Sequence, residues 1–460
     1  MSIDGTLGMG LSGLAKDSSS YTGAKLNVAS ALTLGSDSKL SLTFLSSDLQ
    51  TDEETDWLTL IEGEGTVNGS WNGVIAQNAR YDITLNDDQR QVKVKYTISA
   101  SEAAKDAGAN DNEAAAAEAW DEEIKANPTS QIAQVMNTLS QSTSNTKEYV
   151  EALESLAPVQ VAMTKANVSS LNQGIYTVAS NHMSGGAGMA AGDMFSYKSV
   201  WMQGMYNNTK YDVEGGFDGN TVGGAVGLDI ESEDDITAGV GYAYAYSSLN
   251  STGKKIKADT QNIFLYTNYT GLERWYFDGT FGYNFGDYKE NKTVAGLSGS
   301  GNYNVSSFAL QAQAQYMLND YITPLAGLTY LYAHQGKYTD GFEQTISSSN
   351  DRTLTMKLGA TIGRDFIIGR NPRYFGTVLK PQVQLAAIWD IVQHGDDIMV
   401  SLTNSSYTIQ SEQLKKFGAQ AGFSLGIGLS DNVELTFGYD GQFRSHYYNH
   451  TGTAKFKYSF

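Results

Sequence analysis

Apolar and polar residues alternate strictly along several long segments in the second half of the chain. From Phe417 to Leu429 every second residue is apolar, and the residues between are glycine, serine or glutamine. Phe308–Leu318 repeats this pattern with glutamines on the opposite face, and Leu354–Ile362 alternates with threonine, lysine and glycine. A period of two predicts strands with one apolar and one polar face. Each runs for about ten residues, enough to cross a bilayer as a tilted strand.

The same reading predicts twelve strands between residues 193 and 460. They are expected at 197–206, 221–230, 236–248, 257–270, 274–286, 303–318, 322–333, 353–365, 375–392, 412–429, 432–444 and 449–460. Long polar connections are expected at 207–220, 249–256, 287–302, 335–351 and 393–411, and short turns alternate with them. Short turns at one end and long loops at the other are typical of outer-membrane barrels. The fold class predicted is mainly β, with a 12-stranded antiparallel transmembrane β-barrel. A soluble β-sandwich or lipocalin-like barrel also alternates, but its strands are shorter.

The first 192 residues follow two other patterns. Residues 1–100 hold short strand-like runs at Ala31–Leu34, Leu40–Leu45, Trp57–Ile61, Tyr81–Leu85 and Val92–Ile98, separated by Gly and Asn/Asp steps. They predict a short β-solenoid or junction segment. Residues 101–192 change to helical spacing, with one apolar face at Ile132, Val135, Met136 and Leu139 and another at Val150, Leu153 and Leu156. We expect a helical linker there.

Composition excludes several classes of function. The formal net charge of −19 leaves no basic face for nucleic acid, and the absence of cysteine excludes disulfides and zinc–thiolate sites. No run of 18 apolar residues predicts a membrane-spanning helix. The first residues lack the basic and apolar regions of a secretory signal, so we expect the sequence to be a fragment of a longer protein.

Four stretches resemble the autotransporter family of secretion proteins. Residues 193–460 resemble the family's β-domain, including its opening at Ser199–Gly204 and the run Asp218–Asp229. Tyr149–Pro158 resembles the segment before its pore helix, and Leu58–Asn72 is similar to the junction that ends pertactin-like passengers. The resemblance implies an outer-membrane translocator that exports and anchors an N-terminal passenger, with residues 1 to about 150 at the cell surface. It also implies outer-membrane lipid, the barrel-assembly machinery and periplasmic chaperones as partners.

The end of the chain carries a candidate assembly signal. Phe456, Tyr458 and Phe460 share one face of the last strand, and Phe460 is the final residue. In the family that the chain resembles, such a terminal aromatic pattern is read by the assembly machinery. The simpler interpretation is that a lipid-facing strand places aromatic residues at alternate positions, and both interpretations can hold.

The segment Val159–Asn181 is predicted to be a helix inside the barrel. A barrel of twelve strands is wider than the eight-stranded kind that side chains fill, and can admit one helix of about 10 Å diameter. Apolar residues recur in the segment at helical spacing among small and polar ones, and Gln311, Gln313 and Lys380 are expected to face it. The alternatives are a porin with an N-terminal extension and an adhesin in which residues 1–100 themselves bind a ligand.

No enzymatic chemistry, cofactor or metal site is expected. Gly422–Gly426 matches the Gly-x-Ser-x-Gly pattern, but that motif needs a strand–turn–helix elbow and here lies within an alternating strand. The five histidines, His182, His334, His394, His446 and His450, lack metal-ligand spacing. The one Asn-Asn pair, Asn207-Asn208, lies outside the predicted pore helix, so we expect no self-cleavage by asparagine cyclisation.

Overall fold

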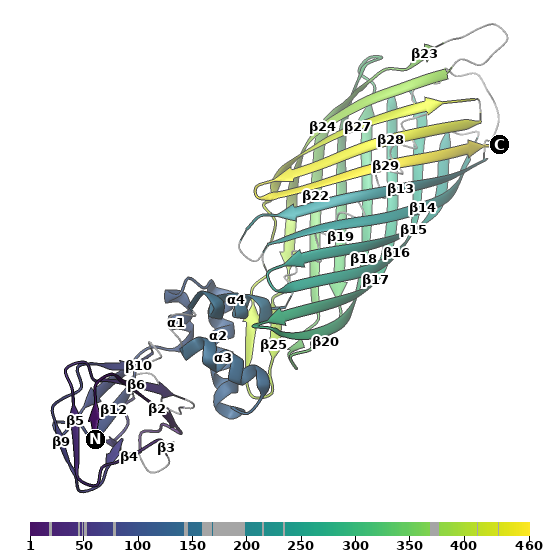
Figure 1. Ribbon diagram of the computed structural model, residues 1–460. Helices are drawn as coiled ribbons and strands as arrows, with labels where there is room; N and C mark the ends of the chain where they lie inside the picture. Colours follow the sequence, from purple (N-terminus) through teal and green to yellow (C-terminus); the bar gives the residue numbers. More distant parts are fainter. Residues whose placement is uncertain are drawn as a thin grey trace.

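A computed structural model places two β units at opposite ends of the molecule, with helices from residues 100–156 between them (Figure 1). It describes residues 1–17, 21–44, 47, 49, 53–76, 80–141, 146–158, 168, 198–213, 216–232, 235–368, 377–411, 413–430 and 432–460. Among these residues, none of the helices has the length and apolar character needed to span a membrane.

The N-terminal unit stacks short parallel strands, the arrangement of a β-solenoid. Its elements are β1 Ser2–Ile3, β2 Thr6–Ser12, β3 Thr22–Gly23, β4 Leu26–Asn27, β5 Ala31–Leu34, β6 Lys39–Phe44, β7 Leu58–Thr59, β8 Ile61–Glu62, β9 Thr66–Asn68, β10 Val74–Ala76, β11 Tyr81–Leu85 and β12 Gln91–Tyr96. Three coils stack through the parallel ladders β1–β5–β9 and β2–β6–β10. The antiparallel hairpin β11–β12 follows the last coil and pairs with β7 through β12. Each of the five strand-like runs predicted from the sequence overlaps one or two of these strands.

Four helices follow: α1 Ala100–Asp106, α2 Asp111–Ala126, α3 Gln131–Gln141 and α4 Thr146–Leu156. We call residues 100–156 the helical cap. Capping boxes built on Ser99 and Asn110 start α1 and α2. Both predicted apolar faces are confirmed, since Met136 and Leu139 of α3 and Leu153 of α4 are buried in one hydrophobic cluster.

The C-terminal unit is a closed antiparallel barrel, as predicted. Its twelve strands are β13 Lys198–Tyr211, β14 Phe217–Glu231, β15 Ile236–Ser251, β16 Lys254–Leu272, β17 Trp275–Val294, β18 Leu297–Tyr316, β19 Ile322–Gln335, β22 Ser349–Gly363, β24 Thr377–Gly395, β27 Phe417–Gly428, β28 Val433–Arg444 and β29 Tyr447–Ser459. Each strand pairs with the next, β22 pairs with β24 and β29 pairs with β13, so the cylinder has no open edge. A short strand, β23 Phe366–Ile368, extends the pairing along β24.

The two ends of the barrel differ. At the turn end, Lys198 meets Phe460 through two main-chain hydrogen bonds of 2.8 and 3.2 Å. The opposite, loop end carries a second small sheet, formed by β20 Tyr338–Thr339, β21 Thr345–Ile346, β25 Ile398–Ser401 and β26 Ser406–Ile409. We call this sheet, with its connecting residues 336–348 and 396–416, the gate sheet.

The prediction of a long polar loop is wrong at three places at the loop end. Most of residues 207–220, 249–256 and 287–302 continues the barrel strands, and Ala295-Gly296 forms a tight connection between β17 and β18. Outside a bilayer the outward face of a strand needs no apolar residues, so the alternation that marks a strand fades although backbone pairing continues. The predicted loops 335–351 and 393–411 contain the gate sheet instead of lacking structure.

Candidate functional site

The outer wall of the barrel presents a belt of apolar side chains, as the alternation predicted. Leu358 and Ile362 of β22 and Phe423 of β27 are exposed on this face, and so are the aromatic Tyr242 and Trp275. An apolar belt with aromatic side chains among its members suits contact with lipid chains and headgroups.

The three residues of the candidate assembly signal lie together on this outward face. Phe456, Tyr458 and Phe460 are all exposed, and the rings of Tyr458 and Phe460 stack with centroids 6.2 Å apart. The main chain of Phe460 also closes the seam with Lys198. The three aromatic groups therefore lie at the turn end of the seam. Their role as an assembly signal stays a prediction.

The inner wall is largely polar, and several of its charged groups have partners on other strands. Asp278 accepts hydrogen bonds from Asn268 at 2.6 Å and from Gln315 at 2.6 Å. Lys380 is paired with Glu434 at 3.1 Å, and Arg444 donates to both oxygens of Asp390 at 2.9 Å. These pairs satisfy polar groups that would otherwise be costly to bury. Gln311, Gln313 and Lys380 do belong to this inner face, but Lys380 is held by Glu434.

The sequence did not predict an aromatic patch that lies on the inner wall. Trp201, Phe264 and Tyr266 point inward and are buried, and the Trp201 indole donates to the Tyr266 hydroxyl at 2.7 Å. Each ring lies over a glycine of a neighbouring strand, since a Cβ at Gly227 or Gly241 would meet the Trp201 or Phe264 ring. The signal that could have found the patch is this set of glycines within otherwise regular strands. The inner wall is therefore not uniformly polar.

The structure places the catalytic-looking motif where no elbow can form. Ser424 lies in the middle of β27 and pairs with Gln382 and Gly438 on its two neighbouring strands. Within the part of the chain that the structure describes, no group of three or more His, Cys, Asp or Glu side chains is arranged to hold a metal ion.

The predicted pore helix lies almost wholly outside the described residues. Of Val159–Asn181 the structure describes Val168, which is helical and buried. Val168 belongs to the hydrophobic cluster that contains cap residues and inward-facing residues of the barrel's loop end.

At the loop end the gate sheet folds inward over the barrel wall. Gly299 and Gly301 lie on the lumen-facing side of β18, and a Cβ on either would come about 3 Å from Gly341 or Asp340. The Tyr303 ring of β18 stacks on Tyr338 of the gate sheet with centroids 4.7 Å apart.

The helical cap sits on the gate sheet and on the tips of the barrel strands (Figure 1). The carbonyl of Leu156, at the end of α4, accepts hydrogen bonds from Lys292 of β17 at 3.0 Å and from Gln344 at 2.8 Å. Lys292 is 1% exposed and forms an ion pair with Asp340 at 2.8 Å. The cap and the barrel mouth therefore share one core and one buried polar cluster.

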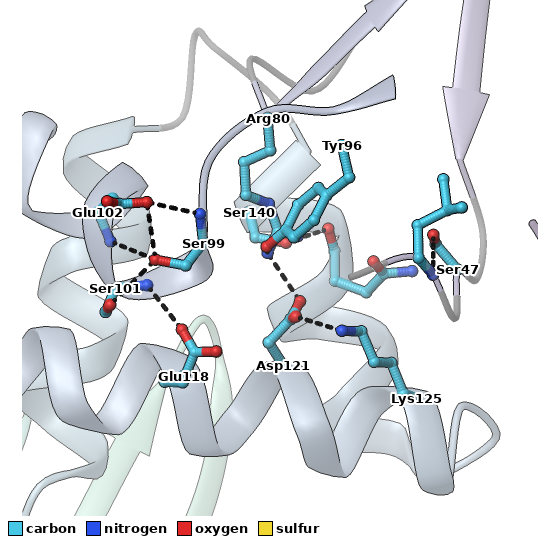
Figure 2. Close-up of polar contacts among 12 residues, drawn as sticks. Ser47, Arg80, Tyr96, Ser99, Ser101, Glu102, Glu118, Asp121, Lys125 and Ser140 are labelled. Atoms are coloured by element: carbon cyan, nitrogen blue, oxygen red, sulfur yellow. Dashed lines mark hydrogen bonds and ion pairs between the residues drawn. The ribbon is translucent and has the colours of Figure 1, made fainter. Parts of the chain in front are cut away.

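On its other side the cap is joined to the solenoid by a buried ion pair. Arg80 donates to Asp121 of α2 at 2.7 Å, and Lys125 contacts the same carboxylate at 3.2 Å (Figure 2). The Arg80 Cζ lies 5.7 Å from the centroid of the Tyr96 ring. Burial opposes ionisation of Asp121, but the charges of Arg80 and Lys125 outweigh it and lower the pKa of this carboxyl.

A family model described as the autotransporter beta-domain matches residues 200–440, just over half of the chain. The chain belongs to the autotransporter family. Its barrel is an outer-membrane translocator that exports N-terminal passenger sequence and anchors it at the cell surface.

Individual relatives agree with this assignment. The translocator domain of the autotransporter NalP from Neisseria meningitidis shares the fold with a TM-score of 0.53 at 16% identity, covering 66% of this chain and 100% of that domain. Outer membrane protein B of Rickettsia prowazekii is 21% identical over 283 residues, and that of Rickettsia typhi is 24% identical over 311 residues. These matches cover 57% and 60% of this chain but 17% and 18% of the relatives, so the chain spans less than a fifth of their length.

Proposed function

We propose that the barrel exports residues 1–158 and keeps them attached through polypeptide that crosses the lumen. The observation that supports this is that Leu156 and Lys198 lie at opposite ends of the barrel. Leu156 is bound at the loop end, and Lys198 is bonded to Phe460 at the turn end. Because the sheet is closed, residues 159–197 connect the ends either through the lumen or across the lipid face. Backbone crossing the lipid face would have polar groups without partners unless it were fully helical.

The lumen suits a helical occupant with mixed faces. Val159–Asn181 combines apolar residues such as Val161 and Leu171 with Ser169, Ser170 and Asn172. The inner wall offers a polar lining together with the aromatic patch of Trp201, Phe264 and Tyr266. A helix of this length is marginal alone in water, so the wall would supply its ordering. The burial of Val168 supports this placement.

The mechanism in this proposal needs binding surfaces and no catalysis. The apolar belt holds the barrel in outer-membrane lipid. The aromatic residues at the seam, Phe456, Tyr458 and Phe460, are recognised by the barrel-assembly machinery. Before assembly, periplasmic chaperones keep the unfolded chain soluble. The chain is not an enzyme in this proposal, consistent with Ser424 lying in an uninterrupted strand. The passenger therefore stays attached unless another protease cuts it.

Site-directed labelling in intact cells tests the topology. The chain has no cysteine, so single cysteines are clean reporters. Asp87→Cys lies in an exposed turn of the solenoid, and Glu273→Cys is its exposed counterpart in a turn at the opposite end. A membrane-impermeant maleimide should label Asp87→Cys in intact cells, on the full-length chain, and Glu273→Cys only after the outer membrane is permeabilised. Labelling of Asp87→Cys only after permeabilisation would favour a porin with a periplasmic extension.

A further inference from the structure

The outer mouth of the barrel contains contacts that neither anchoring nor a lumen segment requires. We propose that the gate sheet is a docking surface for the exported helical cap, and that docking seals the barrel from outside. This seal rests on the proposed export of the cap and goes beyond it, because it holds whether or not a segment fills the lumen.

The gate sheet packs closely against the lumen-facing side of β18 at the mouth of the barrel. A Cβ on Gly299 would lie 2.9 Å from the Gly341 carbonyl carbon, and one on Gly341 would collide with the backbone of Ser300. Only glycine permits backbones to approach this closely. The sheet therefore lies inside the rim of β18 and narrows the mouth.

The cap holds the first hairpin of the gate sheet through the end of α4. The last carbonyls of a helix have no partner within it and favour a cation. Leu156 meets both Lys292, at 3.0 Å, and Gln344, at 2.8 Å. Lys292 also bonds Asp340 of the gate sheet at 2.8 Å, so one buried ammonium joins barrel, gate sheet and cap. Such a charge is tolerable when buried only if it has these partners.

The cap holds the second hairpin through α2. The backbone N–H of Asn404 donates to Glu123 at 2.8 Å, and the Ser405 hydroxyl donates to the Ala119 carbonyl at 2.7 Å. The backbone N–H of Gln410 donates to the Asn112 side chain at 2.8 Å. Both hairpins are thus clamped from outside, and they cannot move away from the lumen while the cap is docked. Because residues 100–156 reach this place only after export, the seal forms when export ends.

Conductance of the full chain in planar bilayers tests the seal with two changes, made singly and together. Gly341→Val displaces the gate sheet, and deletion of 159–181 removes the predicted lumen helix; Gly452→Ala, at an open position, is the matched control. Each single variant should conduct like the wild type. The double variant should conduct about tenfold more, since twelve strands enclose an aqueous path. Heat-modifiable migration on gels verifies that every variant is folded.

The outcomes separate this inference from the proposed function. An open pore on deletion alone would overturn the seal and leave the lumen helix supported. An open pore in Gly341→Val alone would support the seal and overturn the lumen helix. A double variant that stays closed would also overturn the seal.

Cross-linking measures docking of the cap directly. Asn112→Cys and Gln410→Cys, joined by a short bismaleimide, report that α2 touches the gate sheet. Lys292→Met should lower the cross-linking yield several-fold, whereas Lys289→Met, exposed on the same strand, should leave it unchanged. An unchanged yield in Lys292→Met would overturn the role of Lys292 in docking.

Discussion

Asp121 and Arg80 are each nearly buried where the solenoid meets the cap, and the Asp121 pKa is lowered by Arg80 and Lys125 against the effect of burial. Removing one partner of such a pair leaves the other charge buried without compensation. We expect Asp121→Asn to cost about 3 kcal/mol of unfolding free energy in this part of the molecule at neutral pH. Urea unfolding in detergent, followed by circular dichroism, measures it.

The pH dependence of the same pair has a definite sign. A carboxyl whose folded pKa is depressed stabilises the fold above its unfolded pKa, about 3.9, and loses that contribution as the pH falls through the folded value. The gap between wild type and Asp121→Asn should therefore shrink below about pH 4. Asp111→Asn is the control, because Asp111 and its partner Lys105 are both exposed. Equal effects of the two substitutions would contradict the importance of burial.

A substitution at Phe460 distinguishes recognition of this side chain by the assembly machinery from its contribution to the stability of the barrel. Its side chain is exposed to lipid, and its loss forfeits about 2 kcal/mol at most, too little to unfold a twelve-stranded barrel. Phe460→Ala keeps the main-chain bonds to Lys198. We expect this variant to assemble slowly in the outer membrane, as measured by the rate at which the heat-modifiable form appears. Phe417→Ala removes another exposed aromatic from the lipid face and should assemble normally. Equal rates for both variants would argue against a signal at Phe460.

At the scale of elements, the sequence predicted what the membrane dictates. All twelve strands were foreseeable, because lipid on one side and a polar lumen on the other force a period of two. Residues such as Leu358 and Phe423 lie on the expected face. Beyond the membrane this constraint ends, so the sequence pattern predicts loops where the strands in fact extend to Tyr211 and Val294. Residue 168 alone is described within the predicted pore helix, so that prediction remains open.

The contacts of the gate sheet could not have been predicted for a different reason. Lys292 and Leu156 are 136 positions apart, and a main-chain carbonyl leaves no trace in residue type. The pairing of Arg80 with Asp121 joins a turn of the solenoid to a helix face in the same way. Local pattern identified each element but carried no information about which elements meet. The glycines at 299 and 341 are visible in the sequence, yet only the fold shows that they face one another.

At the scale of the whole molecule, the hydrophobic clusters divide the chain differently from its β and α units. The solenoid has its own core, which includes Leu42 and Val94. The cap shares a core with the barrel mouth, where Trp120 and Leu153 belong to the same cluster as Tyr288 and Ile398. Stability should follow these clusters, because burial of apolar surface is the dominant favourable term in folding. The cap should therefore behave as part of the barrel.

Amide hydrogen exchange at increasing urea concentration, read by mass spectrometry on the full chain in detergent, tests this division. Cooperative units exchange together once their opening becomes accessible. We expect peptides from residues 1–96 to lose protection first. Peptides from 100–156 should lose it later, together with those from the tips of β17 and β18. Asp121→Asn should advance exchange of the solenoid while leaving this order intact, because it cuts only the link between the two units. If peptides from 100–156 instead exchanged with the solenoid while the strand tips stayed protected, the cap would belong to the passenger, and its contacts with Lys292 and Gln344 would contribute little to its stability.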